Sequence, residues 1–387
     1  MKSADSVRPF AIAAAIAFVY SGTAHAHHGF GLFVLEENVE YSGTLTKLEL
    51  VNPHSYLYFD TVGADGKTLS MRCEMRAATL LKRSGWKVET FVSGAHVEVK
   101  GHPHRNDPHS CYLETVTVGD APTIDRNDQF SSAAPVNTAD RALRLPTGEP
   151  NISGDWAIEQ AVLTIPPSGG RGELVPRSLR PAFAAGEISV EEIRARNPRP
   201  APPVYTAAGK AAADAFRQWS PEDNPRLACK PTSIIFDWTF DWPVNRITQT
   251  TSADGEKVID IDYGLFSFSR RIHMGLQRHP DNVVASNTGH SIGRWDGDTL
   301  LVESIGFAPG VLVPPTRNSS QLHIVERFTL DTEKMALKRE YTAEDPVYLA
   351  AAYQGSDTSF ISETPFERHR CEELTPEFQN QATKPSP

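Results

Sequence analysis

Histidines in the first third of the chain have the spacing of potential metal ligands. Six of the seven histidines between residues 27 and 109 are the candidates: His27, His28, His54, His102, His104 and His109. If the chain is cut after Ala26, the amine and the imidazole of His27 can chelate one ion together. A second imidazole completes a three-nitrogen set that suits Cu(II). The predicted copper ligands are therefore His27, His54, His102 and His104. The alternative is a solvated terminus and histidines that stabilise turns.

A second group of candidate catalytic and substrate-binding residues lies in the last third of the chain. Residues i and i+2 of a strand share a face, so His323 and Arg327 lie on one face and Glu326 on the other. A histidine beside a carboxylate at a barrel mouth can act as a general base, because its ordinary pKa is close to working pH. The predicted catalytic residues are His290, His323 and Glu326, and the predicted substrate contacts are Arg270, Trp295 and Arg327. The alternative is that Trp295 belongs to the core.

The first 26 residues predict export from the cytoplasm. Lys2 and Arg8 precede an apolar run from Phe10 to Tyr20, and Ala24-His25-Ala26 fits the rule for signal-peptidase cleavage. The apolar run is shorter than the ~20 residues needed to span a bilayer. We expect residues 1–26 to be removed, and the mature chain to be a soluble periplasmic or secreted protein that does not insert into the membrane.

The overall charge argues against a nucleic-acid-binding protein, and several common catalytic and nucleotide-binding motifs are missing. A net charge of −10 opposes nucleic-acid binding, which depends on basic surface that neutralises phosphates. The sequence contains no glycine-rich nucleotide-binding motif, no Gly-x-Ser-x-Gly and no Cys-x-x-Cys.

The four cysteines predict disulfides in an oxidising compartment. Of the three possible pairings, Cys73–Cys111 with Cys229–Cys371 keeps each bridge within one module, and we prefer that pairing. The alternative is that some of them are buried free thiols.

Alternating polar and apolar residues predict a mainly β protein with two modules. Residues 27–120 contain about five strand-like segments and one helical stretch, which suits a small OB-like barrel. Residues 121–225 are broken by prolines and predict an arm, packed on the second module, with short helices near 190–196 and 206–218. Residues 226–373 contain seven or eight strand-like segments, and 374–387 a flexible tail. Eight antiparallel strands enclose space for one small ligand, so we expect a lipocalin-like barrel with an apolar cavity open at the His290 end.

The N-terminal module resembles an uncharacterised secreted bacterial family. Members begin the mature chain His-His-Ser-Phe and carry a Gly-x-Val strand, an Asn-Pro-His turn and a Leu-x-Arg-x-Gly-Trp helix end. The corresponding residues here are His27-His28-Gly29-Phe30, Gly43-Thr44-Leu45, Asn52-Pro53-His54 and Leu81-Lys-Arg83-Ser-Gly85-Trp86, which depart from the family at Gly29 and Leu45. The resemblance covers residues 27–120 and implies a domain boundary rather than a reaction. The terminal histidine also resembles the histidine brace of copper-dependent polysaccharide monooxygenases and of periplasmic copper carriers.

Residues 229–350 resemble a second poorly characterised secreted bacterial family. Its motif is Gly-His-Ser-Ile-Gly-Arg-Trp-Glu-Gly-Asp-Thr, and this chain differs from it at Asp296. The other matching residues are His279-Pro280, His323-x-x-Glu326-Arg327 and Glu344-Asp345-Pro346.

Three interpretations of the function remain open. In the first, the barrel binds a small hydrophobic molecule, either without converting it or converting it by acid/base chemistry without a cofactor. In the second, the N-terminal module is a copper site and the barrel is its scaffold or docking surface. In the third, the protein is a non-catalytic binding protein of the cell envelope, and its polar clusters are structural. The sequence leaves open whether the protein is an enzyme.

Overall fold

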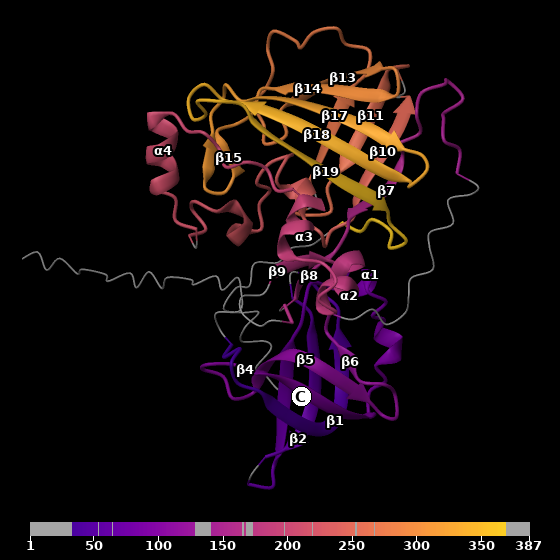
Figure 1. Ribbon diagram of the computed structural model, residues 1–387, viewed down its shortest axis with the longest axis vertical. Coiled ribbons are helices and arrows are strands. Elements are labelled where there is room, and N and C mark those ends of the chain that lie inside the picture. Colours follow the sequence, from indigo (N-terminus) through magenta and orange to yellow (C-terminus); the bar gives the residue numbers. More distant parts are fainter. Residues whose placement is uncertain are drawn as a thin grey trace, which may run out of the picture.

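A computed structural model describes residues 33–127, except 53 and 64, and residues 141–368, except 165, 168–172, 197, 219, 252–253 and 267 (Figure 1). Two closed β-barrels lie at opposite ends of the molecule, and α1, α2, β8 and β9 lie between them. The predicted mainly β class with a smaller N-terminal and a larger C-terminal barrel is confirmed. Within the described ranges no helix is long and apolar enough to cross a membrane.

Five strands close the N-terminal barrel in the order β3-β2-β1-β4-β5, with a parallel β3–β5 pairing that completes the ring. These strands and a short sixth are β1 (Val39–Glu49), β2 (Tyr56–Val62), β3 (Thr68–Glu74), β4 (His96–Pro103), β5 (Ser110–Val118) and β6 (Ile124–Asp125). The helix α1 (Ala78–Arg83) and the 3-10 turn η2 (Val88–Thr90) connect the third strand to the fourth. This order, with its helix after the third strand, agrees with the OB-like expectation.

Alternation along the strands builds the core of this barrel. In β4, Val97 and Val99 are buried while His96 and Glu98 face outward. Cys73 and Cys111 face each other across the parallel β3–β5 pair and form a disulfide, which confirms that predicted pairing. Cys229 is also disulfide-bonded. Cys371, its predicted partner, lies outside the described residues.

Nine strands form the C-terminal barrel, in the order β10-β11-β12-β13-β14-β17-β18-β19-β7. They are β7 (Gly154–Ile158), β10 (Asn245–Thr251), β11 (Lys257–Asp262), β12 (Ser269–His273), β13 (His290–Asp296), β14 (Thr299–Ile305), β17 (His323–Asp331), β18 (Ala336–Glu344) and β19 (Tyr353–Ile361). Neighbouring strands are antiparallel except β12 and β13, which run parallel. The expected count was seven or eight. The structure adds β7, which comes from the proline-rich arm and closes the ring between β10 and β19.

Short elements complete the arm and the rim of the large barrel. Two hairpins are β8 (Ala161–Thr164) with β9 (Glu173–Pro176) and β15 (Gly310–Val313) with β16 (Thr316–Asn318). The helices are α2 (Arg180–Ala184), α3 (Val190–Arg196) and α4 (Ala207–Asp214), and the 3-10 turns are η3 (Arg177–Leu179), η4 (Pro225–Ala228) and η5 (Asp237–Thr239). The helix expected near 190–196 is α3, and the one expected near 206–218 is α4, which ends earlier.

The interior of the large barrel is filled by side chains. Strand residues such as Ile259 and Phe328 pack around Ile234, Ile235 and Trp238, which enter from the segment before β10. Trp238 lies edge-on against Phe328, with ring centroids 6.1 Å apart. These buried groups occupy space in which the sequence analysis expected an apolar ligand cavity.

The helix α1 joins the two barrels through Arg83. This side chain donates to the carbonyl of Asp241 and, from Nη2 at 2.7 Å, to the carbonyl of Ile158. Gln160 adds a hydrogen bond from its Nε2 to the carbonyl of Leu80 at 3.0 Å. Burial lowers the pKa of Arg83 to about 10, although the nearby Asp241 opposes that shift. The Leu-x-Arg-x-Gly-Trp helix end therefore serves the contact between modules.

Candidate functional site

Histidines and glutamates gather on the outer face of the large barrel. Inward residues such as Ile272 and Glu326 are buried, so their strand neighbours point outward. The register places His273 of β12 beside Ile292, and Ile292 beside Glu303 of β14. Strand alternation thus puts side chains from separate strands on one surface.

Three imidazoles form a compact group, which we call the histidine cluster: His273, His279 and His290. The Nδ1 atoms of His279 and His290 are 2.8 Å apart. The ring of His273 stacks on that of His290, with centroids 5.0 Å apart and planes 7° from parallel. Glu256 holds His273 through Oε1, 2.7 Å from Nδ1. The cluster therefore joins the end of β12, the loop before β13 and the first residue of β13.

Two members of the histidine cluster have lowered pKa values. Burial lowers the pKa of His290, and charge on His273 and His279 would lower it further, while Glu256 opposes the shift. Burial also lowers the pKa of His279, with Glu303 opposing and His323 adding to the effect. Both shifts favour neutral imidazoles, which can accept a proton or bind a metal ion.

His323 lies between two carboxylates. Its Nε2 is 3.0 Å from Oε1 of Glu303, and its Nδ1 is 3.5 Å from Oε2 of Glu344. The two carboxylates hold the ring in place from both sides. Glu303 acts electrostatically on His279 as well, so the structure connects the predicted residues His290 and His323 through His279 and Glu303.

Glu326 lies apart from these histidines, inside the barrel. It faces Arg270, with 2.5 Å between Oε2 and Nη1, and Arg339, with 3.3 Å between Oε1 and Nη1. Arg339 also binds Asp357 at 2.7 Å. Both Glu326 and Arg270 are buried, so neither is placed to contact a ligand at the surface. Trp295 packs against the core.

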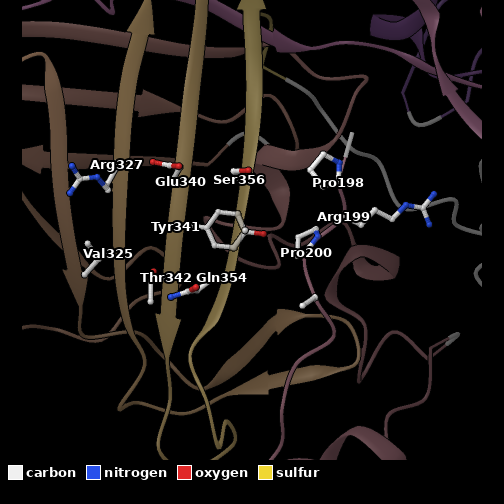
Figure 2. A pocket seen from close by; sticks show the side chains of 12 residues that line it. Pro198, Arg199, Pro200, Val325, Arg327, Glu340, Tyr341, Thr342, Gln354 and Ser356 are labelled. Carbon is white, nitrogen blue, oxygen red and sulfur yellow. The ribbon is translucent and has the colours of Figure 1, made fainter. Parts of the chain in front are cut away.

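A groove of about 430 Å³ lies on the outer face of β17, β18 and β19, where the arm passes beside the barrel (Figure 2). The strands contribute Val325, Arg327, Glu340, Thr342, Gln354 and Ser356, and the arm contributes Pro198, Arg199, Pro200 and Ala201. Val325 lies two residues from His323 on the same face of β17, so the groove adjoins the Glu303–His323 pair.

Arg327 is the predicted substrate contact that reaches this groove. Glu340 lies opposite Arg327 on the neighbouring strand. The carboxylate of Glu340 pairs with Lys338 at 2.7 Å and not with Arg327. No ion pair to Arg327 forms among the residues that the structure describes. The guanidinium of Arg327 is therefore available to an anion in the groove.

Tyr341 and Gly355 shape the groove beside the arm. Gly355 pairs with Tyr341, and a Cβ on Gly355 would lie 2.3 Å from the Tyr341 hydroxyl and 2.9 Å from Pro200. The missing side chain leaves room for the tyrosine ring, whose hydroxyl points toward the prolines of the arm (Figure 2). A larger residue at this position would displace the ring or the arm.

Three of the four candidate copper ligands, His54, His102 and His104, each have a local partner. His54 pairs with Glu74, and His102 Nδ1 lies 2.9 Å from the carbonyl of Glu37. His104 Nδ1 accepts hydrogen bonds from the backbone amides of residues 106 and 107, as a turn-stabilising side chain does. His27 lies outside the described residues. Across the described ranges, no three His, Cys, Asp or Glu side chains come together as metal ligands.

No role was predicted from the sequence for His273, Glu256, Glu303 or Glu344. His279 and Glu344 appeared there only as residues of a family motif. One signal was present: Glu303 alternates with buried Val302 and Ser304 and therefore faces outward. The contact between His279 and His290 depends on how a loop folds back, and strand periodicity carries no information about that.

Residues 15–111 match the model of a family of unknown function (DUF6152). The match covers most of the N-terminal barrel and none of the C-terminal one. Searches of curated proteins and of solved structures returned no match to the chain.

Proposed function

We propose that this chain is an exported binding protein of the cell envelope, which holds a small amphiphilic acid in the outer groove of its C-terminal barrel. The ligand has an apolar body and one carboxylate. Export is inferred from the first 26 residues, and the absence of catalysis from the filled interior and the ion-paired state of Glu326.

The observation that carries the proposal is the guanidinium of Arg327, which lines the groove and forms no ion pair with any residue that the structure describes. A carboxylate can accept two hydrogen bonds from a guanidinium, which gives both affinity and orientation. Glu340, the nearest opposite charge across the strand pair, is already bound by Lys338. The ligand anion would therefore take the open position at Arg327.

The remaining lining suits an apolar body with polar edges. Pro198 and Pro200 on the arm and Val325 on β17 offer apolar surface, while Thr342 and Ser356 offer hydroxyls. A volume of about 430 Å³ lies in the range of small-molecule sites. The proposed ligand therefore still has an apolar body, as expected from the sequence, but its binding site is the outer groove and not the interior of the barrel.

The test compares acids with their uncharged analogues. Aromatic and medium-chain carboxylic acids, and the matching amides, are added to the protein in a thermal-shift screen, and the hits are measured by calorimetry. We expect acids to bind and amides to bind at least about 10-fold more weakly, because a charge-assisted hydrogen bond contributes about 1.5–3 kcal/mol.

Arg327→Ala should abolish the preference for acids, whereas Arg294→Ala should preserve it. Arg294 is exposed on β13 and does not line the groove, so it controls for the loss of one surface charge. Equal binding of acids and amides, or unchanged binding by R327A, would refute the proposal.

A further inference from the structure

A hydrogen bond between two imidazoles fastens the loop that connects β12 to β13, residues 274–289. His290 begins β13, and His279 lies in the loop. Their Nδ1 atoms are 2.8 Å apart, and the two ring planes meet at 72°. The end of the loop is fixed separately, because the amide of Ser286 donates to the carbonyl of Gly306. The imidazole contact therefore positions the part of the loop that precedes Ser286.

This hydrogen bond exists only while one of the two nitrogens carries no proton. A neutral imidazole has one N–H donor and one acceptor nitrogen, whereas a protonated imidazole has two donors and no acceptor. At least one of the two rings must therefore be neutral, and the bonded pair carries one positive charge at most. When both rings are protonated, two N–H groups face each other, and repulsion between two cations replaces the bond.

We propose that the hydrogen bond between His279 and His290 is a pH-sensitive latch, which holds residues 274–285 closed at neutral pH and releases them at acidic pH. The closed loop binds at most one proton on this pair, whereas the open loop binds two. Falling pH therefore favours the open loop. Since the ordinary pKa of histidine is about 6.5, release begins below that value.

The surroundings of His279 disfavour a second proton on its ring. Its Nε2 is buried and has no hydrogen-bond partner among the described residues, so a charged ring would bury an unsatisfied N–H group. Burial lowers the pKa of His279, Glu303 of β14 opposes that shift, and His323 of β17 adds to it. On the loop itself, Arg278 and Asp281 are 85% exposed and lie 3.9 Å from each other, so they act mainly on each other.

His290 faces a different set of charged groups. The ring of His273 stacks on it with centroids 5.0 Å apart, and Glu256 in turn contacts Nδ1 of His273. Burial lowers the pKa of His290, protons on His273 and His279 would lower it further, and Glu256 opposes the shift. Both rings of the latch are therefore neutral at neutral pH, which is the state in which the hydrogen bond forms.

Hydrogen–deuterium exchange of the full-length protein, without any ligand, measures the opening of the loop. Exchange of peptides from residues 274–285 is compared at about pH 5 and about pH 7.5, after correction for the intrinsic rates of unfolded peptides of the same sequence. Each additional proton bound by the open loop raises the opening constant about 10-fold per pH unit below about 6.5. We therefore expect acidification to raise the opening constant about 10-fold or more, with no such rise in peptides from β17.

His279→Ala removes the latch, so its loop should be open to the same extent at both pH values. His96→Ala is the control, because it removes an exposed imidazole from the N-terminal barrel, and it should preserve the pH dependence. An opening constant that is equal at the two pH values in the unmodified protein would overturn the proposal, even if H279A does not fold. A pH dependence that persists unchanged in H279A would overturn it as well. Neither outcome bears on acid binding at Arg327, because none of residues 274–290 lines the groove.

Discussion

Arg270 on β12 and Glu326 on β17 form an ion pair inside the C-terminal barrel, with 2.5 Å between Nη1 and Oε2 and side chains that are 1% and 0% exposed. Arg339 and Asp357 extend the pair into a group of two cations and two anions. Removing one member leaves an uncompensated buried charge, which costs far more than the loss of a surface ion pair.

Glu326→Gln should therefore destabilise the protein by about 3–5 kcal/mol, since two arginines lose their shared carboxylate. The measurement is urea unfolding followed by tryptophan fluorescence. Glu340→Gln removes the exposed partner of Lys338 and should cost about 1 kcal/mol or less. Similar losses in the two variants would contradict a stabilising role for the buried group.

Asp237 should make stability depend on pH. Burial raises the pKa of this carboxyl to about 7, although the backbone amide of Thr232 and the charge of Arg226 oppose the shift. The folded state thus binds more protons than the unfolded state between about pH 4 and 7. Stability must fall as pH rises through that window, by roughly 4 kcal/mol at most.

Asp237→Asn keeps the shape and removes the titration. We expect its free energy of unfolding to change less between pH 4 and pH 8 than that of the unmodified protein, and to exceed it at pH 8. A pH dependence that persists unchanged in D237N would rule out Asp237 as its source.

Arg83 should couple the two barrels. Arg83→Ala removes both hydrogen bonds to the carbonyls of Asp241 and Ile158, at a cost of about 3 kcal/mol. Because these bonds connect the modules, calorimetry should show two separate unfolding transitions in R83A. The neighbouring Lys82→Ala breaks only a surface pair with Glu367 and should unfold like the unmodified protein. A single cooperative transition in R83A would mean that other contacts are enough to couple the unfolding of the two barrels.

Gly355 should be intolerant of a side chain. A Cβ there would lie 2.3 Å from the Tyr341 hydroxyl, so Gly355→Ala should cost about 1–3 kcal/mol. The cost should shrink in a Tyr341→Leu background, which a double-mutant cycle measures. A Cβ added to Gly275 would meet no atom of the described residues within 4 Å, so Gly275→Ala should change stability by about 0.5 kcal/mol or less. Equal effects at the two glycines would contradict the close contact.

Strands that alternate apolar and polar residues were found from the sequence, whereas two strands of the larger barrel that do not alternate, β7 and β19, were missed. The segment predicted at 323–330 is β17. In β19 the inward positions include Gly355, Asp357 and Ser359, so no hydrophobic pattern marks it. Those positions stay small or polar because Tyr341 and Arg339 already fill the adjacent interior. Likewise β7 is only five residues long, too short for periodicity to distinguish it from the surrounding arm.

By itself, the sequence indicated that the chain has two β modules and that His323 and Arg327 share a face opposite Glu326, and it favoured the pairing of Cys73 with Cys111, which the structure confirms. Each of these follows from local periodicity or from short separation along the chain. Only the tertiary structure decided that Glu326 points inward, that β7 closes the larger barrel, and that His279 meets His290. The reason is physical: the inward face of a strand is defined by how the sheet closes, and a loop finds its contacts only after distant strands have paired.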